Sequence, residues 1–263
     1  MAEKGSAMQE KSSGILENTG RIKVPKSSNL LADRLRDQIF SDVYPQGSSL
    51  PTERELVTAT GLSRGSVREA LRILESQGLV TTKAGRYGGS TISQPSDDLL
   101  ASHIHFYAKG RSVPLRSLIE VRLALGPMVA FLAAQNRTDE DIANLNAITE
   151  RLDAAAEKNA ELFLDENANW HDALATASHS ELLRAFAKSV AGMMLDVSRL
   201  EKFASKEVRA RVSHAHHKIL EAIVAGDREL ARARAEKDIN AYAMDLVQAL
   251  AAVAQSDDGD DKK

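Results

Sequence analysis

The chain has 263 residues, a formal net charge of −3 and no cysteine. This length suffices for two domains with separate cores, and the lack of cysteine excludes disulfide frameworks and thiolate metal sites. No stretch approaches the roughly 18 uninterrupted apolar residues of a membrane span. The first twenty residues also lack the apolar segment of a secretion signal, so we expect a soluble, cytoplasmic protein that does not engage a membrane.

The charge is unevenly distributed along the chain. Residues 21–93 contain 11 Lys and Arg against 7 Asp and Glu, whereas the rest of the chain carries the excess of acidic residues. A net charge averaged over two domains can conceal a basic surface on one of them. The N-terminal third is therefore the part in which a nucleic-acid-binding module is expected.

Polar, aperiodic sequence over residues 1–27 predicts a flexible N-terminal arm. Apolar residues at helical spacing then predict a first helix over residues 30–40, which a turn signal at residues 44–47 ends. The first folded domain is therefore expected to span residues 28–93.

Two further helices are predicted next. Thr52 and Glu55 have the spacing of a capping box, in which each side chain bonds a free backbone amide, and Gly61 ends that helix. Ser63 caps the following helix, which Gly78 ends. The apolar face of this third helix consists of Val67, Ala70, Leu71 and Leu74.

A short hairpin is predicted after the third helix. Residues 79–82 and 90–93 favour β-strands, and the glycine-rich segment 84–89 between them would form the hairpin tip. Two short helices, a capped third helix and a hairpin in this order are typical of a winged helix-turn-helix domain. The hairpin tip would then be the wing.

Long amphipathic helices with few strand-forming residues follow residue 94. Helix-breaking residues interrupt this pattern at 110–114, 136–138, 178–180 and 226–227. No repeat of solenoid period is present, so we expect one antiparallel bundle of six or seven helices over residues 94–254 and a disordered acidic tail over residues 255–263. The expected fold class is mainly α, with an N-terminal winged helix-turn-helix domain and a C-terminal bundle.

Arg64 and Arg68 lie four residues apart on the third helix, opposite its apolar face. The first turns of a recognition helix enter the major groove, where one Arg guanidinium can donate two hydrogen bonds to a guanine. Gly65 and Ser66 between them would allow close approach and a hydroxyl contact. We therefore expect this helix to read bases of double-stranded DNA.

Phosphate contacts are expected from basic residues outside that helix, namely Arg54, Lys83 and Arg86. The alternative for Arg64, Arg68 and Arg72 is a solvated face paired with acidic residues of the same helix. Glu69 and Glu75 have suitable positions for such pairs. The order of the elements favours DNA contact for the first two arginines, whereas Arg72 lies two turns into the helix and is expected to be structural.

Three motifs stand out in this region: Leu50-Pro-Thr-Glu-Arg-Glu-Leu, Leu62-Ser-Arg-Gly-Ser-Val-Arg-Glu-Ala-Leu-Arg-Ile-Leu-Glu and Gly78-Leu-Val. Together they resemble the GntR family of bacterial repressors. The resemblance implies a homodimer that reads a short palindromic operator. It also implies that Arg54, Arg64, Arg68 and the wing glycine Gly85 contact the DNA.

The helical part contains three further motifs: Glu120-Val-Arg122, Trp170-His171-Asp-Ala-Leu and His216-His217-Lys-Ile-Leu-Glu-Ala-Ile. They resemble the FadR-type C-terminal domain of the same family, called FCD, which binds effectors and forms dimers. Such domains commonly hold a divalent metal with an Asp, a His four residues later and two further His. Carried over by position, the resemblance implies the ligands Asn167, His171, His216 and Asp238.

Two of these positions depart from the family pattern, because Asn167 stands where Asp is usual and Asp238 where the last His is usual. The set still offers one carboxylate and two imidazoles, which can hold zinc, nickel or manganese with positions left open. Asn167 and His171 are one helical turn apart and can approach the same ion. The alternative is that His171 and His216 are core histidines with satisfied hydrogen bonds, and both interpretations stay open. The other histidines, for which no partner spacing is evident, are His103, His105, His179, His214 and His217.

Arg122 lies within the apolar sequence Leu118-Ile-Glu-Val-Arg-Leu-Ala-Leu, so its charge requires an anion if the side chain points inward. The resemblance implies that this anion is a small organic acid, held against the metal and the arginine. The alternative is a salt bridge to Glu120 or Glu166.

These features predict a DNA-binding transcription repressor that a small carboxylate effector releases from its operator. A second hypothesis is a metal-dependent hydrolase that uses His171, His216 and Asp238. No motif places a general base or a nucleophile beside them, so we do not expect an enzyme. A third hypothesis is an architectural DNA binder whose bundle serves only for dimerisation.

Overall fold

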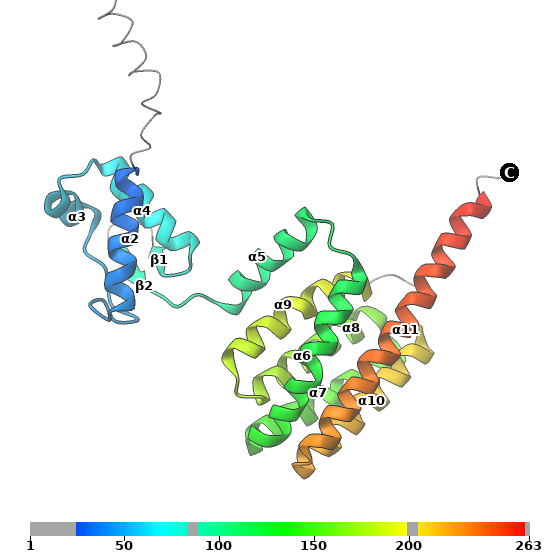
Figure 1. The fold of residues 1–263 in the computed structure, drawn as a ribbon. Coiled ribbons are helices and arrows are strands. Elements are labelled where there is room, and N and C mark those ends of the chain that lie inside the picture. Colours follow the sequence, from blue (N-terminus) through cyan, green and yellow to red (C-terminus); the bar gives the residue numbers. More distant parts are fainter. Residues whose placement is uncertain (1–24, 84–88, 199–204, 261–263) are drawn as a thin grey trace, which may run out of the picture. The chain divides into compact units, whose positions relative to one another are not determined.

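The computed structural model describes residues 25–83, 89–198 and 205–260. The chain separates into two compact units, Met1–Pro95 and Ser96–Lys263, and each has a hydrophobic core of its own. Figure 1 shows a small unit that combines helices with one hairpin and a larger unit built of long helices. The mainly α fold class predicted from the sequence is confirmed.

The N-terminal unit contains the predicted elements in the predicted order: α2 (Ser27–Phe40), α3 (Glu53–Thr60), α4 (Arg64–Ser76), β1 (Val80–Lys83) and β2 (Gly89–Ile92). The two strands pair antiparallel, with Val80 opposite Ile92. Buried apolar side chains of α2, α3 and α4 form the core together with Leu79, Val80 and Ile92. The hairpin is thereby fixed to the back of α4, while residues 84–88 at its tip lie outside the described residues.

Local signals determine the ends of α3 and α4. Thr52 Oγ1 accepts from the amide of Glu55 while Glu55 Oε2 accepts from the amide of Thr52, which is the predicted capping box. Gly61 ends α3 in the left-handed conformation, with φ 68°, where a side chain would be strained. Ser63 Oγ accepts from the amide of Ser66 and caps α4. The first turn of α4 is therefore fixed in its orientation by its own sequence.

The C-terminal unit consists of seven helices within the described residues, in agreement with the six or seven expected. They are α5 (Asp97–Gly110), α6 (Leu115–Asn136), α7 (Asp139–Lys158), α8 (Ala160–Ala177), α9 (Glu181–Ser198), α10 (Lys206–Ala225) and α11 (Arg228–Asp260). All four predicted breaks fall between helices. The break between α7 and α8 was not predicted, and there Asn159 both ends α7 and caps α8 through its side chain.

The prediction of a disordered acidic tail over residues 255–263 is wrong in part, because α11 continues through Asp260. The segment that precedes the acidic residues, Ala249-Leu-Ala-Ala-Val-Ala-Gln255, consists almost entirely of good helix formers. No glycine or proline interrupts it before Gly259. The helix therefore extends into sequence whose charge alone indicated a solvated coil.

Helix α6 lies at the centre of the larger unit, between α9 and α11 in Figure 1, and also packs on α8 and α10. Trp170 of α8 is completely buried behind it and donates from Nε1 to Thr149 Oγ1 at 3.1 Å. In the described part of the chain, α6 is also the one helix long and apolar enough to cross a membrane by length and composition. Its packing against four neighbouring helices accounts for that composition only in part, because 28% of the apolar stretch is buried and side chains such as Val121 and Met128 remain exposed.

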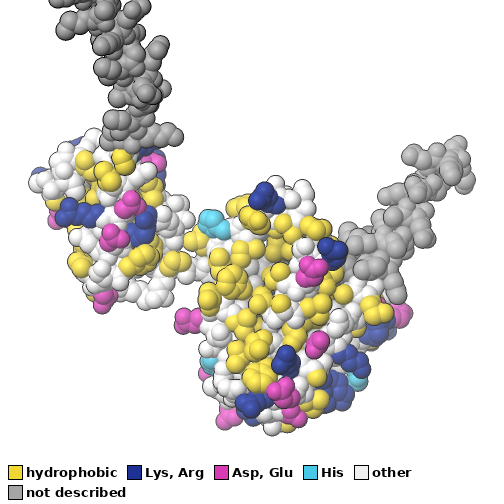
Figure 2. All heavy atoms as spheres, viewed as in Figure 1, with side chains coloured by type: hydrophobic (Ala, Val, Ile, Leu, Met, Phe, Trp, Pro, Cys, Tyr) yellow, Lys and Arg dark blue, Asp and Glu magenta, His cyan; other side chains and the backbone are white. Residues whose placement is uncertain are grey.

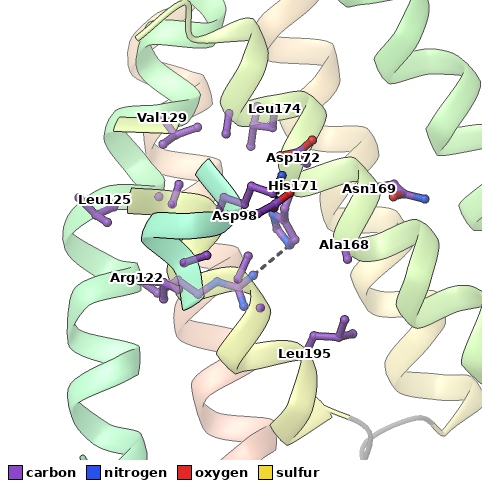
Figure 3. A pocket seen from close by; sticks show the side chains of 18 residues that line it. Asp98, Arg122, Leu125, Val129, Ala168, Asn169, His171, Asp172, Leu174 and Leu195 are labelled. Carbon is purple, nitrogen blue, oxygen red and sulfur yellow. Dashed lines mark hydrogen bonds and ion pairs between the residues drawn. The ribbon is translucent and has the colours of Figure 1, made fainter. Parts of the chain in front are cut away.

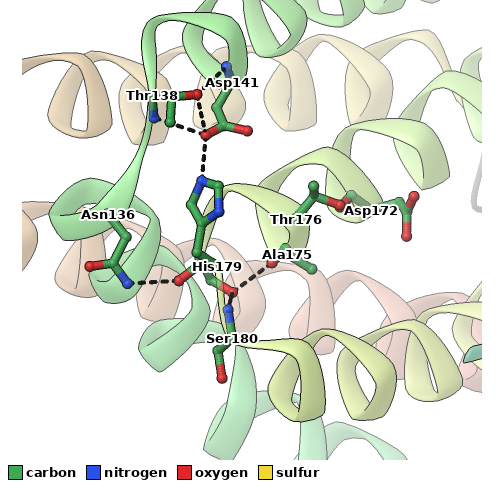
Figure 4. Close-up of polar contacts among 9 residues, drawn as sticks. Asn136, Thr138, Asp141, Asp172, Ala175, Thr176, His179 and Ser180 are labelled. Atoms are coloured by element: carbon green, nitrogen blue, oxygen red, sulfur yellow. Dashed lines mark hydrogen bonds and ion pairs between the residues drawn. The ribbon is translucent and has the colours of Figure 1, made fainter. Parts of the chain in front are cut away.

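Side chains join the turn before α7 to the turn after α8 (Figure 4). Asp141 Oδ2 accepts from the amide and the hydroxyl of Thr138, and His179 Nε2 lies 2.7 Å from the same oxygen. Burial opposes the change, but the hydrogen bonds from Thr138 and His179 lower the pKa of Asp141. His179 thus has a partner that lies 38 residues away along the chain, which sequence spacing could not indicate.

Replacing Gly226 by alanine is expected to destabilise the helical unit. Gly226 ends α10 with φ 73°, and an added Cβ would lie 2.8 Å from Nη2 of Arg137, which donates to the carbonyl oxygen of Val224. Left-handed backbone costs a residue with a Cβ about 1–2 kcal/mol, so the free energy of unfolding should fall by at least that amount. Trp170 is the only tryptophan and lies in this unit, so its fluorescence during urea denaturation reports on it.

The matched control is Gly110→Ala, because Gly110 has no positive φ and no atom within 4 Å of an added Cβ. This variant should be as stable as the wild type or slightly more stable. Equal urea midpoints for the two variants would show that the end of α10 carries no such constraint.

Candidate functional site

The side chains of Arg64 and Arg68 are exposed on the first two turns of α4, away from its buried residues. Arg68 Nε donates to Glu53 Oε2 of α3 at 2.8 Å, although 63% of the Arg68 side chain remains exposed. Arg64 has no hydrogen bond or ion pair with the described residues. An exposed ion pair of this kind contributes little to stability, so both guanidinium groups are accessible to a ligand.

The alternative was that Arg64, Arg68 and Arg72 pair with acidic residues of α4. Of these three, only Arg72 does so, at 3.8 Å from Glu69. Glu75 instead accepts a hydrogen bond from the backbone of Thr82 at 3.2 Å. The expectation that Arg72 is structural therefore agrees with its contacts. The partner of Arg68 on another helix was not foreseen.

The other residues expected at the DNA surface differ in how they are placed. Arg54 and Lys83 are exposed at α3 and at the end of β1. A Cβ on Gly65 would meet Ser63 Oγ at 3.8 Å, an ordinary contact, so the fold itself does not require glycine there. The hydroxyl of Ser66 already lies 3.0 Å from that of Ser63. Gly85 and Arg86, expected at the wing, lie outside the described residues.

In the helical unit, a cavity of about 20 Å³ brings the sequence-predicted ligands together. Its wall includes Asn167 and His171 from α8, His216 from α10 and Asp238 from α11, together with Arg122 from α6. A space of this size holds a single water molecule or ion. Four helices that are distant in sequence thus place one guanidinium, two imidazoles, one amide and one carboxyl around one point.

The aromatic rings around the cavity are closely packed. The His216 ring stacks on Trp170 with 3.8 Å between centroids and an angle of 7°. His171 and His216 meet edge to face at 5.1 Å. Both are ordinary separations for packed rings, so the two imidazoles and Trp170 form one compact aromatic group.

Arg122 does not form either salt bridge considered as the alternative. Glu120 pairs with Arg116 at 3.3 Å, and Glu166 pairs with Arg151 at 3.1 Å. That alternative is wrong because both carboxylates already have other arginines as partners.

Arg122 instead donates from Nη2 to His171 Nε2 at 3.0 Å (Figure 3). Its guanidinium also lies 4.7 Å from the ring centroid of Tyr242. Because a guanidinium can only donate, His171 Nε2 is the acceptor, and the ring proton is on Nδ1. The direct contacts of the positive charge are thus neutral groups, while Asp238 of the same cavity interacts with it without an ion pair among the described residues. An anion in direct contact would improve its environment.

Three buried polar atoms at the small cavity have no hydrogen-bond partner: Asn167 Oδ1 and both ring nitrogens of His216. His216 is completely buried, so the description of a satisfied core histidine is wrong for this residue. A buried polar atom without a partner costs roughly 1–3 kcal/mol. All three atoms belong to two of the four expected metal ligands, Asn167 and His216.

Burial, with Arg122 adding to it, lowers the pKa of His216 to about 3 and that of His171 well below its usual value. Burial raises the pKa of Asp238 to about 6, although Arg122 opposes this change. At neutral pH both imidazoles are thus uncharged, as metal coordination requires.

The donor set matches a borderline divalent cation, and the partnerless atoms are of the type that such an ion binds. In the described ranges, however, no group of three or more His, Asp or Glu side chains is gathered as a metal cluster. The fourth donor is an amide, and Arg122 occupies Nε2 of His171. The residues therefore fit an ion by chemistry, and the ion would compete with the guanidinium for that nitrogen.

A second pocket of about 400 Å³, partly open to solvent, is lined by Arg122 and His171 together with other residues of α5, α6, α8 and α9 (Figure 3). We call it the chamber. Only Arg122 and His171 line both spaces. A ligand in the chamber would therefore meet the guanidinium and the imidazole that also face the small cavity.

Sequence reasoning missed several residues of this region. Tyr242 follows Asp238 by one helical turn, so its position on the same face of α11 was open to prediction. Lys188 and Asp98 line the chamber and pair at 3.0 Å, but α5 and α9 meet only through tertiary packing. His217, which was set aside, pairs with Asp153 at 2.8 Å outside the cavity.

Comparison with known families shows matches over both units. A model described as bacterial regulatory proteins, gntR family, matches residues 28–87, and a model described as FCD domain matches residues 117–241. These matches run from α2 to just beyond β1 and from α6 into α11, and they include the exposed arginines of α4 and the residues of the small cavity other than Tyr242.

Curated relatives carry the same type of description. The chain is 33% identical over 134 residues to the uncharacterized HTH-type transcriptional regulator Rv0494 of Mycobacterium tuberculosis, covering 49% of this chain and 54% of that protein. It is 30% identical over 172 residues to the Glc operon transcriptional activator of Escherichia coli K12, covering 64% and 66%. The chain thus spans between about half and two thirds of the length of these relatives.

Among solved structures, a Streptococcus agalactiae GntR protein is similar with a TM-score of 0.55 at 24% identity, covering 81% of this chain and 98% of that chain. This similarity supports the fold alone.

Replacing His216 by phenylalanine is expected to stabilise the protein when chelator has removed any metal. Phenylalanine keeps the stack on Trp170 and removes two buried nitrogens without partners, so the free energy of unfolding should rise by about 1–3 kcal/mol. Urea denaturation in chelator measures the change. His217→Phe is the control, since His217 is exposed and paired, and it should bring no gain. A destabilised His216→Phe would mean that His216 is held by interactions other than its stack.

Proposed function

Because the chain belongs to the GntR family of bacterial regulatory proteins, with an N-terminal GntR helix-turn-helix domain and a C-terminal FCD domain, it is a DNA-binding transcription regulator, and we propose that a small carboxylate controls its operator binding. The single observation that carries the proposal is the position of Arg122. Its guanidinium forms no ion pair with a carboxylate of the described residues, since Asp238 interacts with it only from within the small cavity, and it also lines the chamber. The matching families and relatives are regulators, not enzymes.

In the N-terminal unit, we assign base reading to Arg64 and Arg68 and phosphate contact to Arg54 and Lys83. The support is that α4 exposes both arginines on its first turns, while the capped N-terminus fixes their direction. Arg68 would exchange its exposed partner Glu53 for a base edge. Base contacts specify a sequence, whereas phosphate contacts position the protein.

In the helical unit, we propose a divalent cation held by Asn167, His171, His216 and Asp238. When bound, such an ion supplies a positive charge that a carboxylate oxygen can ligate. Arg122 would then release His171 and donate to the same carboxylate, so its charge would gain an anion. The support is the group of partnerless buried atoms at the small cavity.

The route from the chamber to the DNA-binding unit is proposed to be α5. This helix begins directly after the boundary between the units, and its residues Asp98 and Ala101 line the chamber. Ion pairs of Asp97 with Arg184 at 2.9 Å and of Asp98 with Lys188 hold α5 on α9. A ligand that binds one arrangement of α5 more tightly shifts the operator-binding equilibrium by that difference in affinity.

We further propose that the regulator is a cytoplasmic homodimer that represses its target promoter. Figure 2 shows hydrophobic side chains gathered over the face of the helical unit where α6 lies, and α6 exposes Val121 and Met128. An apolar surface of this kind on a soluble protein favours association. A dimer would match the two halves of a palindromic operator. Transcription from the target promoter in vitro separates a repressor from an activator such as the E. coli relative.

Alanine at Arg64 or Arg68 is expected to remove sequence preference. Each substitution should weaken binding to the palindromic operator by about 1–3 kcal/mol while leaving most of the salt-dependent binding to random DNA. Fluorescence anisotropy with both DNA types measures the ratio, and a half-site duplex tests the dimer. Arg72→Ala is the control from the same helix and should keep the preference. Equal losses on operator and random DNA would exclude base reading by these residues.

Divalent metal is expected to change the fluorescence of Trp170. Because the His216 ring stacks on this single tryptophan, manganese or nickel in the small cavity should quench its emission, and chelator should restore it. His171→Ala combined with His216→Ala should abolish the response and reduce the metal content of the purified protein to background. His217→Ala should leave both unchanged. If the wild type contained no more metal than the double variant, the proposed ion would be ruled out.

A further inference from the structure

We propose that the chamber selects a monocarboxylic acid with an apolar body as the effector, rather than a short hydroxy acid, a sugar acid or a dicarboxylate. The inference rests on the proposed function, because it takes the carboxylate to lie at Arg122. What it adds comes from the size, the lining and the charges of the chamber.

The chamber is too large and too apolar for a short acid. Its volume of about 400 Å³ falls in the range of sites for ligands of drug size. The wall includes the aliphatic side chains of Leu125, Val129, Leu174, Val190 and Leu195. An acid of two or three carbons would leave most of this surface without contact, whereas an apolar body would gain about 25 cal/mol for each Å² removed from water.

The chamber offers one cation that forms no ion pair with a carboxylate of its lining. Arg122 donates to His171 and lies over Tyr242, and Asp238, which interacts with its charge, lines the small cavity and not the chamber, so the guanidinium can still accept one carboxylate from the chamber side. Lys188 is the other basic residue of the lining, and it is bonded to Asp98 at 3.0 Å. Asp172 adds a second negative charge near Lys188.

A second carboxylate on the ligand would therefore meet two aspartates and a lysine that is already paired. Like charges disfavour binding, so a dicarboxylate should be excluded. Apart from His171, whose Nε2 is bonded to Arg122, Asn169 is the uncharged side chain of the lining with both a donor and an acceptor for hydroxyl groups. A sugar acid would lose the hydration of its hydroxyl groups against aliphatic walls, at a cost for each unpaired polar group.

The experiment uses the full chain and four probes that share one scaffold or one acid group. They are 3-phenylpropanoate, its 4-carboxy derivative, 3-phenylpropanamide and lactate. Isothermal titration calorimetry measures affinity in protein saturated with manganese. We expect 3-phenylpropanoate to bind at least tenfold more tightly than lactate and the dicarboxylate, and the amide not to bind.

Two glycine variants test where the apolar body lies. Gly192 lines the chamber and has no atom within 4 Å of an added Cβ, so Gly192→Leu narrows the space without a clash at Cβ. This variant should bind 3-phenylpropanoate about tenfold more weakly and should bind lactate with unchanged affinity. Gly110→Leu, also free of contacts at Cβ but outside the chamber lining, should change neither affinity.

The outcomes separate this inference from the proposed function. Lactate or the dicarboxylate binding as tightly as 3-phenylpropanoate, with loss of binding in Arg122→Gln, would overturn the apolar selection and leave carboxylate control intact. If Gly192→Leu lost affinity for lactate and 3-phenylpropanoate equally, the apolar selection would be overturned as well. If no acid bound the wild type in calorimetry, the proposed carboxylate effector would fail together with the inference.

Discussion

The hydrogen bond from Arg122 to His171 is the contact on which the organisation of the helical unit depends. It places a permanent positive charge between a cavity of about 20 Å³, where Asp238 also lies, and the chamber of about 400 Å³. The direct contacts of the guanidinium are neutral groups, and Asp238 interacts with it without forming an ion pair among the described residues. A buried charge whose counter-charge is not in direct contact is costly. The proposed carboxylate effector would supply that direct contact.

Helix packing explains why a stable bundle can carry this cost. Trp170 is completely buried, bonds Thr149 and stacks on His216, so the ring of that histidine is held although neither of its nitrogens has a partner. The apolar core around α6 supplies the stability that the polar site lacks. Proteins commonly place such local violations at functional sites and compensate for them elsewhere. In the N-terminal unit the arginines of α4 are exposed to solvent, so their charges do not carry a comparable burial cost.

Much of the fold followed from local signals in the sequence. Thr52 with Glu55, Ser63 and Gly61 bound the helices of the N-terminal unit, and these signals act within one turn of the chain. The four predicted breaks of the bundle were found for the same reason. Where local signals conflict, prediction failed, as in the acidic end of α11, where the helix-forming alanines determine the conformation. Sequence spacing could not predict which side chains pair across the bundle, as His179 and Asp141 do.

The sequence by itself determined the family, the order of the elements and the face of α4 that carries Arg64 and Arg68, because helical periodicity and capping are encoded over a few residues. It also named Arg122, His171, His216, Asn167 and Asp238 as one group, through resemblance. Only the tertiary structure decided that Arg122 donates to His171 and not to a carboxylate, that neither ring nitrogen of His216 has a hydrogen-bond partner, and that a mostly aliphatic chamber lies beside them. The physical reason is that partners and cavities arise where helices distant in sequence meet, and their packing is a property of the whole bundle.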